Sequence, residues 1–191
     1  MSFPAQLLRG LRATVVLWLL TVVVITLPLL GLAHLMAPEA ASGNLIRRDG
    51  QVVGSLLIGQ SFRSGRYLQG RPAGSPHLAP SNPALRARVA AAASAWQQQG
   101  IDNPAADLLL DSGSGVDPHI SLAAALQQLP RLARERQLPM ATLEQLLAKN
   151  QEGPSSLQAI EPVVNVLTFN LALDALGGAV PSQDPTTLSR P

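Results

Sequence analysis

The chain has 191 residues, of which 47% are hydrophobic, 14% charged and 3% aromatic, and it has no cysteine. This composition excludes a long disordered protein, which has fewer apolar residues, and a small secreted domain built on disulfides. The 14 basic and 12 acidic side chains leave a net charge of only +2, so nucleic acid is not an expected partner.

The first predicted element is an apolar run from Ala13 to Ala33, which is 21 residues long and contains no charge. As a helix with a rise of about 1.5 Å per residue, it is about 32 Å long and can cross a hydrocarbon core of about 30 Å. A buried core helix rarely has apolar residues on every face, and the apolar region of a cleaved signal peptide is usually only about 7 to 15 residues long. The run therefore predicts a retained transmembrane helix over residues 13–35.

Flanking charges predict the orientation of this helix. Arg9 and Arg12 precede the run without an acidic residue, whereas the first charge after it is Glu39. Since basic flanks stay in the cytoplasm, we expect residues 1–12 to be cytoplasmic and residues 36–176 to form an extracytoplasmic domain. Small residues in the run are candidates for close packing against other membrane helices: Thr14, Thr21, Thr26 and Gly31.

Beyond the anchor, the pattern predicts strands first. Gln51–Ile58 is rich in Val, Leu and Ile and lies between two glycines, which is typical of a strand. Residues 66–68 are expected to form a second, shorter strand. The stretch from Gly70 to Pro83 holds four prolines and therefore predicts a loop.

Helices are predicted in the second half of the chain. Asn82 and Pro83 are typical of a helix start, and the helix is expected to end at Gly100. A second helix with apolar residues at helical spacing begins near Leu122, and Pro130 is expected to kink or break it. Thr142 and Gln145 match a capping box that would start a third helix.

The chain ends with an apolar segment, Val163–Leu176, that carries Asn165 and Asn170, followed by residues 177–191, which we expect to be disordered. The mixture of strands and helices after the anchor gives the expected fold class. It is a single N-terminal transmembrane α-helix followed by a small α+β extracytoplasmic domain.

Motifs for catalysis and metal binding are missing from the sequence. There is no phosphate-binding loop or dinucleotide fingerprint, and the three histidines are far apart, so we expect no catalytic residue, no metal site and no firmly bound cofactor. Ser112, Ser114 and Lys149, the only lysine, leave a membrane-tethered Ser/Lys hydrolase open as an alternative. However, a nucleophile elbow would need glycine at position 112. A stand-alone extracytoplasmic binding module is the other alternative.

The connector from Asp107 to Ser121, DLLLDSGSGVDPHIS, has two interpretations. It can be a flexible turn in which Ser121 caps the following helix. It can also be an ordered docking surface, because glycine allows close backbone approach and Ser, Asp and His supply hydrogen bonds. Asp107, Asp111 and Asp117 could then shape the local field for cations.

Four segments of the chain resemble the C subunit of the Kdp-type potassium-transporting ATPase of bacteria, the KdpC family. They are GSLLIGQSF at Gly54–Phe62, YLQGRPAG at Tyr67–Gly74 with PSNP at Pro80–Pro83, SGSGVDPHIS at Ser112–Ser121 and VNVLTFNLALD at Val164–Asp174. The single N-terminal anchor agrees with this family, and the resemblance extends from the anchor to Asp174.

The resemblance implies a non-catalytic accessory subunit of an ATP-driven, high-affinity potassium uptake complex. Its partners would be a channel-like potassium-binding subunit and an ATP-hydrolysing subunit in the bacterial inner membrane, with lipid around the anchor. The family's C subunit is needed for assembly and has been described as a catalytic chaperone that promotes ATP binding. An external domain cannot touch cytosolic ATP, so any such effect would have to be transmitted through coupled states.

The expected interface lies in the segments that carry the resemblance. Gly59 and Gln60, once likened in this family to part of a nucleotide-signature motif, are more simply a strand end with a polar turn. The partner-interface candidates are Gly59, Gln60, Arg71, Pro72, Ser112, Gly113, Ser114, Gly115, Asp117, Pro118, His119, Asn165 and Asn170.

Overall fold

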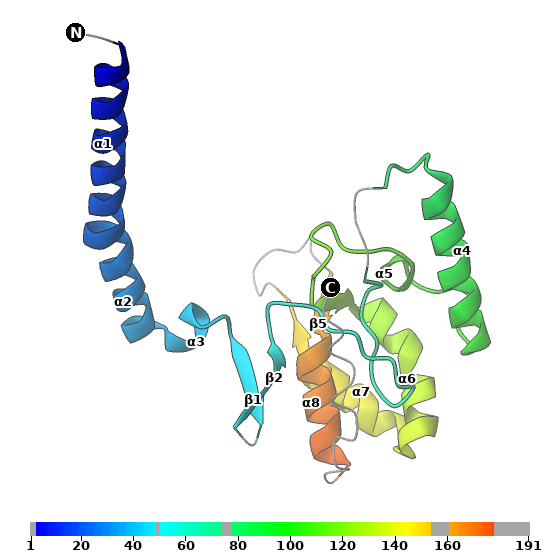
Figure 1. The fold of residues 1–191 in the computed structure, drawn as a ribbon. Coiled ribbons are helices and arrows are strands. Elements are labelled where there is room, and N and C mark those ends of the chain that lie inside the picture. The colour runs from blue at the N-terminus through cyan, green and yellow to red at the C-terminus, as the bar shows by residue number, and fades with distance from the viewer. Residues whose placement is uncertain (1–2, 49, 74–77, 154–160, 178–191) are drawn as a thin grey trace. The chain divides into compact units, whose positions relative to one another are not determined.

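The computed structural model describes residues 3–48, 50–73, 78–153 and 161–177. The chain divides between Leu45 and Ile46 into an N-terminal helical unit and a C-terminal domain (Figure 1). The division agrees with the expected fold class. The tail expected to be disordered lies outside the described residues from position 178 onward.

The N-terminal unit is a helix from Phe3 to Met36 with a mean hydropathy of 2.7 over its most apolar window, and none of that window is buried. It is built from α1 (Phe3–Thr21), a π-helical turn η1 (Val22–Thr26) and α2 (Leu27–Met36), and the short α3 (Pro38–Ala41) follows. Its lack of burial excludes a core helix. Among the described residues, this is the one helix long and apolar enough to cross a membrane.

The π-turn ends at Thr26, two positions before Pro28, whose ring nitrogen cannot donate a hydrogen bond and whose ring crowds the preceding turn. A π-turn takes up one extra residue, which turns the following faces by about 100° relative to a continuous α-helix. Thr26 is thereby brought toward the face of Thr14 and Thr21, whereas Gly31 turns away from it. The four small residues therefore do not form one continuous stripe.

The hydroxyls of Thr14 and Thr21 donate to the carbonyls of Gly10 and Leu17 at 3.0 and 2.9 Å. Because both hydroxyl hydrogens are used within the helix, Thr14 and Thr21 offer a neighbouring helix small side chains but no unpaired hydrogen-bond donor.

The C-terminal domain combines two small sheets with helices (Figure 1). Its elements are β1 (Leu45–Arg48), β2 (Gln51–Ser55), α4 (Pro83–Gln98), α5 (Ala106–Leu109), β3 (His119–Ser121), α6 (Leu122–Arg136), α7 (Met140–Lys149), β4 (Gln151–Glu152), β5 (Val163–Asn165) and α8 (Val166–Leu176). β1 pairs with β2. The second sheet has the antiparallel order β3-β5-β4, with Ile120 opposite Val164.

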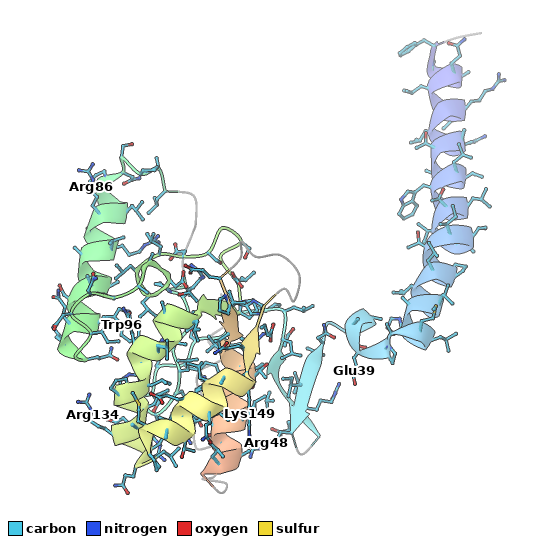
Figure 2. The ribbon with its side chains drawn as sticks, turned by 180° about the vertical axis from the view of Figure 1, so that it is seen from behind. Glu39, Arg48, Arg86, Trp96, Arg134 and Lys149 are labelled. Atoms are coloured by element: carbon cyan, nitrogen blue, oxygen red, sulfur yellow. The ribbon has the colours of Figure 1, made fainter. Side chains whose placement is uncertain are left out.

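The core lies between this three-stranded sheet and helices α6, α7 and α8. Its fully buried members include Ile120, Leu129, Leu143 and Phe169, one from each of four elements. Helix α4 lies at the edge of the domain and is joined to it by Trp96, whose Nε1 donates to the carbonyl of Leu108 at 3.0 Å (Figure 2). The domain therefore has a well-packed hydrophobic core and one helix, α4, at its edge.

Helix starts follow the polar residues that precede them. The side chains of Asn82, Ser121 and Asn165 accept hydrogen bonds from backbone N–H groups in the first turns of α4, α6 and α8. These contacts satisfy N–H groups that have no partner within the helix. The expected starts at Asn82 and Ser121 are thus confirmed, and Asn165, at the junction of β5 and α8, proves to be a cap.

Three local predictions are wrong, and of the kink or break expected at Pro130 the break is excluded. The capping box fails because α7 begins at Met140 after Pro139, so that Thr142 already lies inside the helix. Helix α6 is not broken at Pro130, because Pro130 and Leu126 are exposed and water can reach the carbonyl that the proline leaves unpaired. Residues 66–68 are not a strand, and the predicted strand from Gln51 ends at Ser55.

The segment at residues 65–69 is held by side chains instead of a neighbouring strand. The amide of Asn170 accepts from the N–H of Leu68 at 2.8 Å and donates to its carbonyl at 2.9 Å. Gln128 makes the same two bonds to Gln69, at 2.9 and 3.0 Å. We call this arrangement the amide clamp. It satisfies the buried backbone of an irregular segment, as a sheet would.

Two arginines extend the amide clamp. Arg131 donates to the carbonyls of Gly65 and Tyr67, and burial lowers the pKa of its guanidinium from the ordinary value. Arg136 donates to the carbonyl of Arg66 at 2.8 Å and lies over the Tyr67 ring. Burial and the Asp174 carboxylate raise the pKa of Tyr67. These contacts fix the segment that leads to Arg71.

Candidate functional site

Two adjoining hollows lie beside the loop between α5 and β3. The larger, which we call the loop hollow, has a volume of about 340 Å³ and is lined by Leu56, Leu57, Ser112, Gly113, Ser114, Val116, Asp117, Pro118 and His119. A smaller one of about 40 Å³ shares part of this wall and adds Gly59, Gln60, Gly70, Arg71 and Pro72, among others. Together the hollows gather every interface candidate except Asn165 and Asn170.

The loop is ordered by its own polar side chains. The hydroxyl of Ser112 accepts from the N–H of Asp117 at 3.2 Å, and that of Ser114 accepts from the N–H of Val116 at 3.3 Å. Gly115 has a φ of +75°, which disfavours residues with a Cβ. The sequence SGSGVD therefore forms a turn held by its own hydrogen bonds, and Ser121 caps the following helix as the first interpretation of the connector expected.

Gly59 fastens the segment after β2 to this loop. Its N–H donates to the carbonyl of Val116 at 2.7 Å, and a Cβ at this position would lie 2.6 Å from the carbonyl oxygen of Asp117. The amide of Gln60 folds back on β2. In the amide orientation that satisfies both groups, its nitrogen donates to Val53 O at 3.3 Å and its oxygen accepts from Ser55 N at 3.1 Å. Both residues are explained by contacts within the chain.

Arg71 connects the amide clamp to the loop. Its guanidinium pairs with Asp107 at 2.8 Å, and its Nε donates to the carbonyl of His119 at 3.2 Å. Asp107 in turn accepts from the N–H of Ser121 at 2.6 Å. A planar guanidinium can make such contacts in several directions at once, so Arg71 fixes the exit of the loop into β3.

His119 lies between two carboxylates. Its Nδ1 is 3.1 Å from Asp117 Oδ1, and its Nε2 is 3.2 Å from Glu152 Oε2. Asp117 Oδ1 also accepts from the backbone N–H of His119 at 3.0 Å. The imidazole thus links the loop to β4 at the edge of the three-stranded sheet.

Asn165 and Asn170 hold backbone segments next to the site through side-chain hydrogen bonds. Nδ2 of Asn165 donates to the carbonyl of Leu56 at 3.0 Å, beneath the loop hollow. Asn170 is 2% exposed and belongs to the amide clamp. Both were candidates for a partner interface, yet buried side chains with complete local contacts are structural supports.

The three aspartates proposed to shape a field all have partners within the domain. Asp107 pairs with Arg71, Asp117 with His119, and Asp111 with Arg88 at 2.6 Å. Their neutralisation would remove contacts of the fold as well as charge, so such variants are unsuitable tests of a field.

The Ser/Lys hydrolase alternative has no support in this geometry. Ser112 and Ser114 serve as acceptors for backbone N–H groups of their own loop. Lys149 lies at the end of α7 (Figure 2), and among the described residues no hydrogen bond joins it to either serine. A nucleophile needs a base within hydrogen-bonding reach.

The apolar rim of the loop hollow and the acidic residue on β4 were not predicted. The rim is formed by Leu57 and Val116, which are 56% and 50% exposed, and the neighbouring Ile58 is 51% exposed. Leu57 and Ile58 had been assigned to a strand. Three consecutive apolar residues directly before Gly59 were the available signal, since a strand with one covered face would alternate. Nothing in the sequence indicated that Glu152 would reach His119.

Comparison with known proteins gives a family for this chain. The family model described as KdpC, the c chain of the K⁺-transporting ATPase, matches residues 7–175. The chain belongs to the KdpC family. Its expected resemblance is therefore confirmed over the anchor and the domain alike.

Curated relatives carry the same name. The potassium-transporting ATPase KdpC subunit of Synechocystis sp. is 43% identical over 182 residues, which cover 86% of this chain and 95% of the relative. That of Yersinia pestis is 44% identical over 181 residues, with 85% and 90% covered. That of Anabaena sp. is 38% identical over 191 residues, with 91% and 95% covered.

Membership of the KdpC family confirms several expectations. The chain is a subunit of a potassium-transporting ATPase complex and has an accessory role, not a catalytic one. Its one long apolar helix fits a transmembrane anchor, so it is a membrane-associated subunit of a transporter.

Proposed function

We propose that this chain holds a potassium uptake complex together from the outer side of the bacterial inner membrane. Its partners are the channel-like potassium-binding subunit and the ATP-hydrolysing subunit. The anchor packs among their membrane helices, and the domain docks through the surface around the two hollows. The basic flank at Arg9 and Arg12 supports this orientation.

One observation carries the docking proposal. The loop, the segment after β2 and Arg71 come from separate parts of the chain, yet direct hydrogen bonds join them into one ordered surface. Exposed apolar side chains stand on that ordered surface at Leu57, Ile58 and Val116. A rigid patch that combines apolar and polar groups is typical of a protein interface, because little entropy is lost when it binds.

This arrangement also accounts for an effect on ATP binding without a nucleotide site in the chain. A domain outside the membrane can favour one conformation of the complex over another. ATP that binds the same conformation better is then bound more tightly, through coupling. The chaperone role proposed for this chain is thus an indirect one.

Charge placed on the apolar rim tests the docking surface. We expect Leu57→Asp combined with Val116→Asp to reduce the partner subunits recovered with the tagged full-length chain by about tenfold, the effect of losing roughly 1.4 kcal/mol at an interface. Low-potassium growth should fail as well. Leu126→Asp is the matched control, because Leu126 is 46% exposed but borders neither hollow. Equal recovery with both variants would contradict docking through this surface.

A further inference from the structure

Gly113 lines the loop hollow, and no contact among the described residues requires a glycine there. Its φ lies outside the left-handed region, and a Cβ built on it would meet nothing within 4 Å among the described residues. Gly59 and Gly115 differ, because a Cβ at Gly59 would meet a close carbonyl and Gly115 has a φ of +75°. A side chain at Gly113 would therefore clash with none of these residues, but it would keep the main chain of a partner farther from the loop than glycine does.

The lining of the loop hollow combines two kinds of chemistry. Leu57 and Val116 contribute exposed apolar groups. Asp117 and His119 contribute polar groups, with Glu152 bonded to the imidazole, and the side chains of Asp117 and Glu152 are 37% and 53% exposed. Arg71 pairs with Asp107 at 2.8 Å and reaches Asp117 only at 3.9 Å. Negative charge is therefore left at Asp117 and Glu152.

The geometry points to an extended segment of a partner subunit as the occupant of the loop hollow. Its main chain passes over Gly113, an apolar side chain rests on Leu57 and Val116, and a basic side chain pairs with Asp117 and Glu152. This inference rests on the proposed docking function and adds the chemistry of the segment that docks.

Each part of the proposed partner segment is complementary to one feature of the loop hollow. Main chain can approach a glycine more closely than any other residue. Apolar contacts at the centre of an interface supply affinity, and complementary charge at its rim sets orientation and rate of association. An anionic or zwitterionic lipid surface would bring phosphate groups toward Asp117 and Glu152, which favours a basic peptide over lipid.

A single cysteine at Gly113 identifies the occupant directly, because the chain has no cysteine of its own. We expect Gly113→Cys, labelled with a thiol-specific photo-crosslinker in the assembled complex, to crosslink to a partner segment that contains Lys or Arg. Gly177→Cys is the matched control, since Gly177 is exposed at the end of α8 and borders neither hollow. Crosslinks from position 113 to lipid alone, to this chain alone, or to an acidic segment would overturn the inference.

Charge reversal tests the basic side chain. Glu152→Lys should lower the recovery of partner subunits about tenfold, and Glu152→Gln should lower it less and weaken its dependence on salt. Glu144→Lys on α7 is the control, because Glu144 is exposed and lines neither hollow. A thermal melt of each full-length variant in detergent verifies that the fold is retained.

The outcomes separate the two proposals. Equal recovery with Glu152→Lys and Glu144→Lys, while the rim variant at Leu57 and Val116 still loses its partners, would overturn the basic occupant and leave docking intact. Failure of the wild-type chain to retain any partner would instead remove the proposed function itself.

Discussion

Replacing Asn170 by alanine is expected to lower the free energy of unfolding of the domain by about 3 kcal/mol. The amide of Asn170 makes both hydrogen bonds of the Leu68 backbone, and Leu68 is fully buried. Without it, a buried N–H and a buried carbonyl lose their partners, and each such loss costs about 1–3 kcal/mol. Urea unfolding of the full-length protein in detergent, followed by fluorescence of Trp96 in a Trp18→Phe background, measures the change.

Asn150→Ala is the matched control for this prediction. The amide of Asn150 donates at 2.8 Å to the carbonyl of Leu146 at the end of α7, where solvent can replace it. We expect its loss to cost less than about 1 kcal/mol. If the two variants were equally stable, residues 65–69 would not depend on the amide clamp.

Replacing Arg71 by alanine is expected to make the loop between α5 and β3 mobile while the core remains folded. The variant loses the ion pair with Asp107, whose side chain is 15% exposed, and the hydrogen bond to the carbonyl of His119. A lost charged hydrogen bond costs about 2 kcal/mol in stability. The larger effect should be on the complex, with partner recovery reduced about tenfold or more, because the surface is no longer preorganised.

Arg71→Lys separates geometry from charge in this test. Lysine keeps the positive charge but not the planar group that reaches Asp107 and His119 together, so we expect only partial rescue. Arg86→Ala on α4 is the control, since Arg86 is exposed and labelled in Figure 2 at the outer helix. Full recovery of partners with Arg71→Ala would mean that the loop keeps its shape without this arginine.

Sequence patterns correctly predicted the elements that depend on residues close together in the chain. The anchor follows from 21 uncharged residues, and the starts of α4 and α6 follow from Asn82 and Ser121, which cap their helices within three residues. For the loop, the sequence left two interpretations open, a flexible turn and an ordered surface, although its serines bond N–H groups only two and five positions away.

Long-range contacts account for what the sequence could not predict. Residues 66–68 were expected to form a strand, but the backbone of Leu68 is bonded by Asn170, 102 positions away, and that of the following Gln69 by Gln128, 59 positions away. The pairing of Glu152 with His119 and the bond from Asn165 to the carbonyl of Leu56 likewise join residues 33 and 109 positions apart. The hydrophobic pattern of one segment carries no information about hydrogen-bond partners so far away in the sequence.

The non-catalytic role of a KdpC subunit agrees with how this chain uses its polar side chains. Ser112 and Ser114 order the loop, and Arg71 joins the loop to the segment held by the amide clamp. An accessory subunit needs such a preorganised surface and a tether, and both are present.

The most direct test of the proposed arrangement is the side of the membrane on which the domain lies. Single cysteines at Gln6, before the apolar run, and at Ser94, exposed on α4, can be probed in intact spheroplasts with a thiol reagent that does not cross membranes. We predict labelling of Ser94→Cys in intact cells and of Gln6→Cys only after lysis. The reverse pattern would place the domain in the cytoplasm and contradict docking from outside.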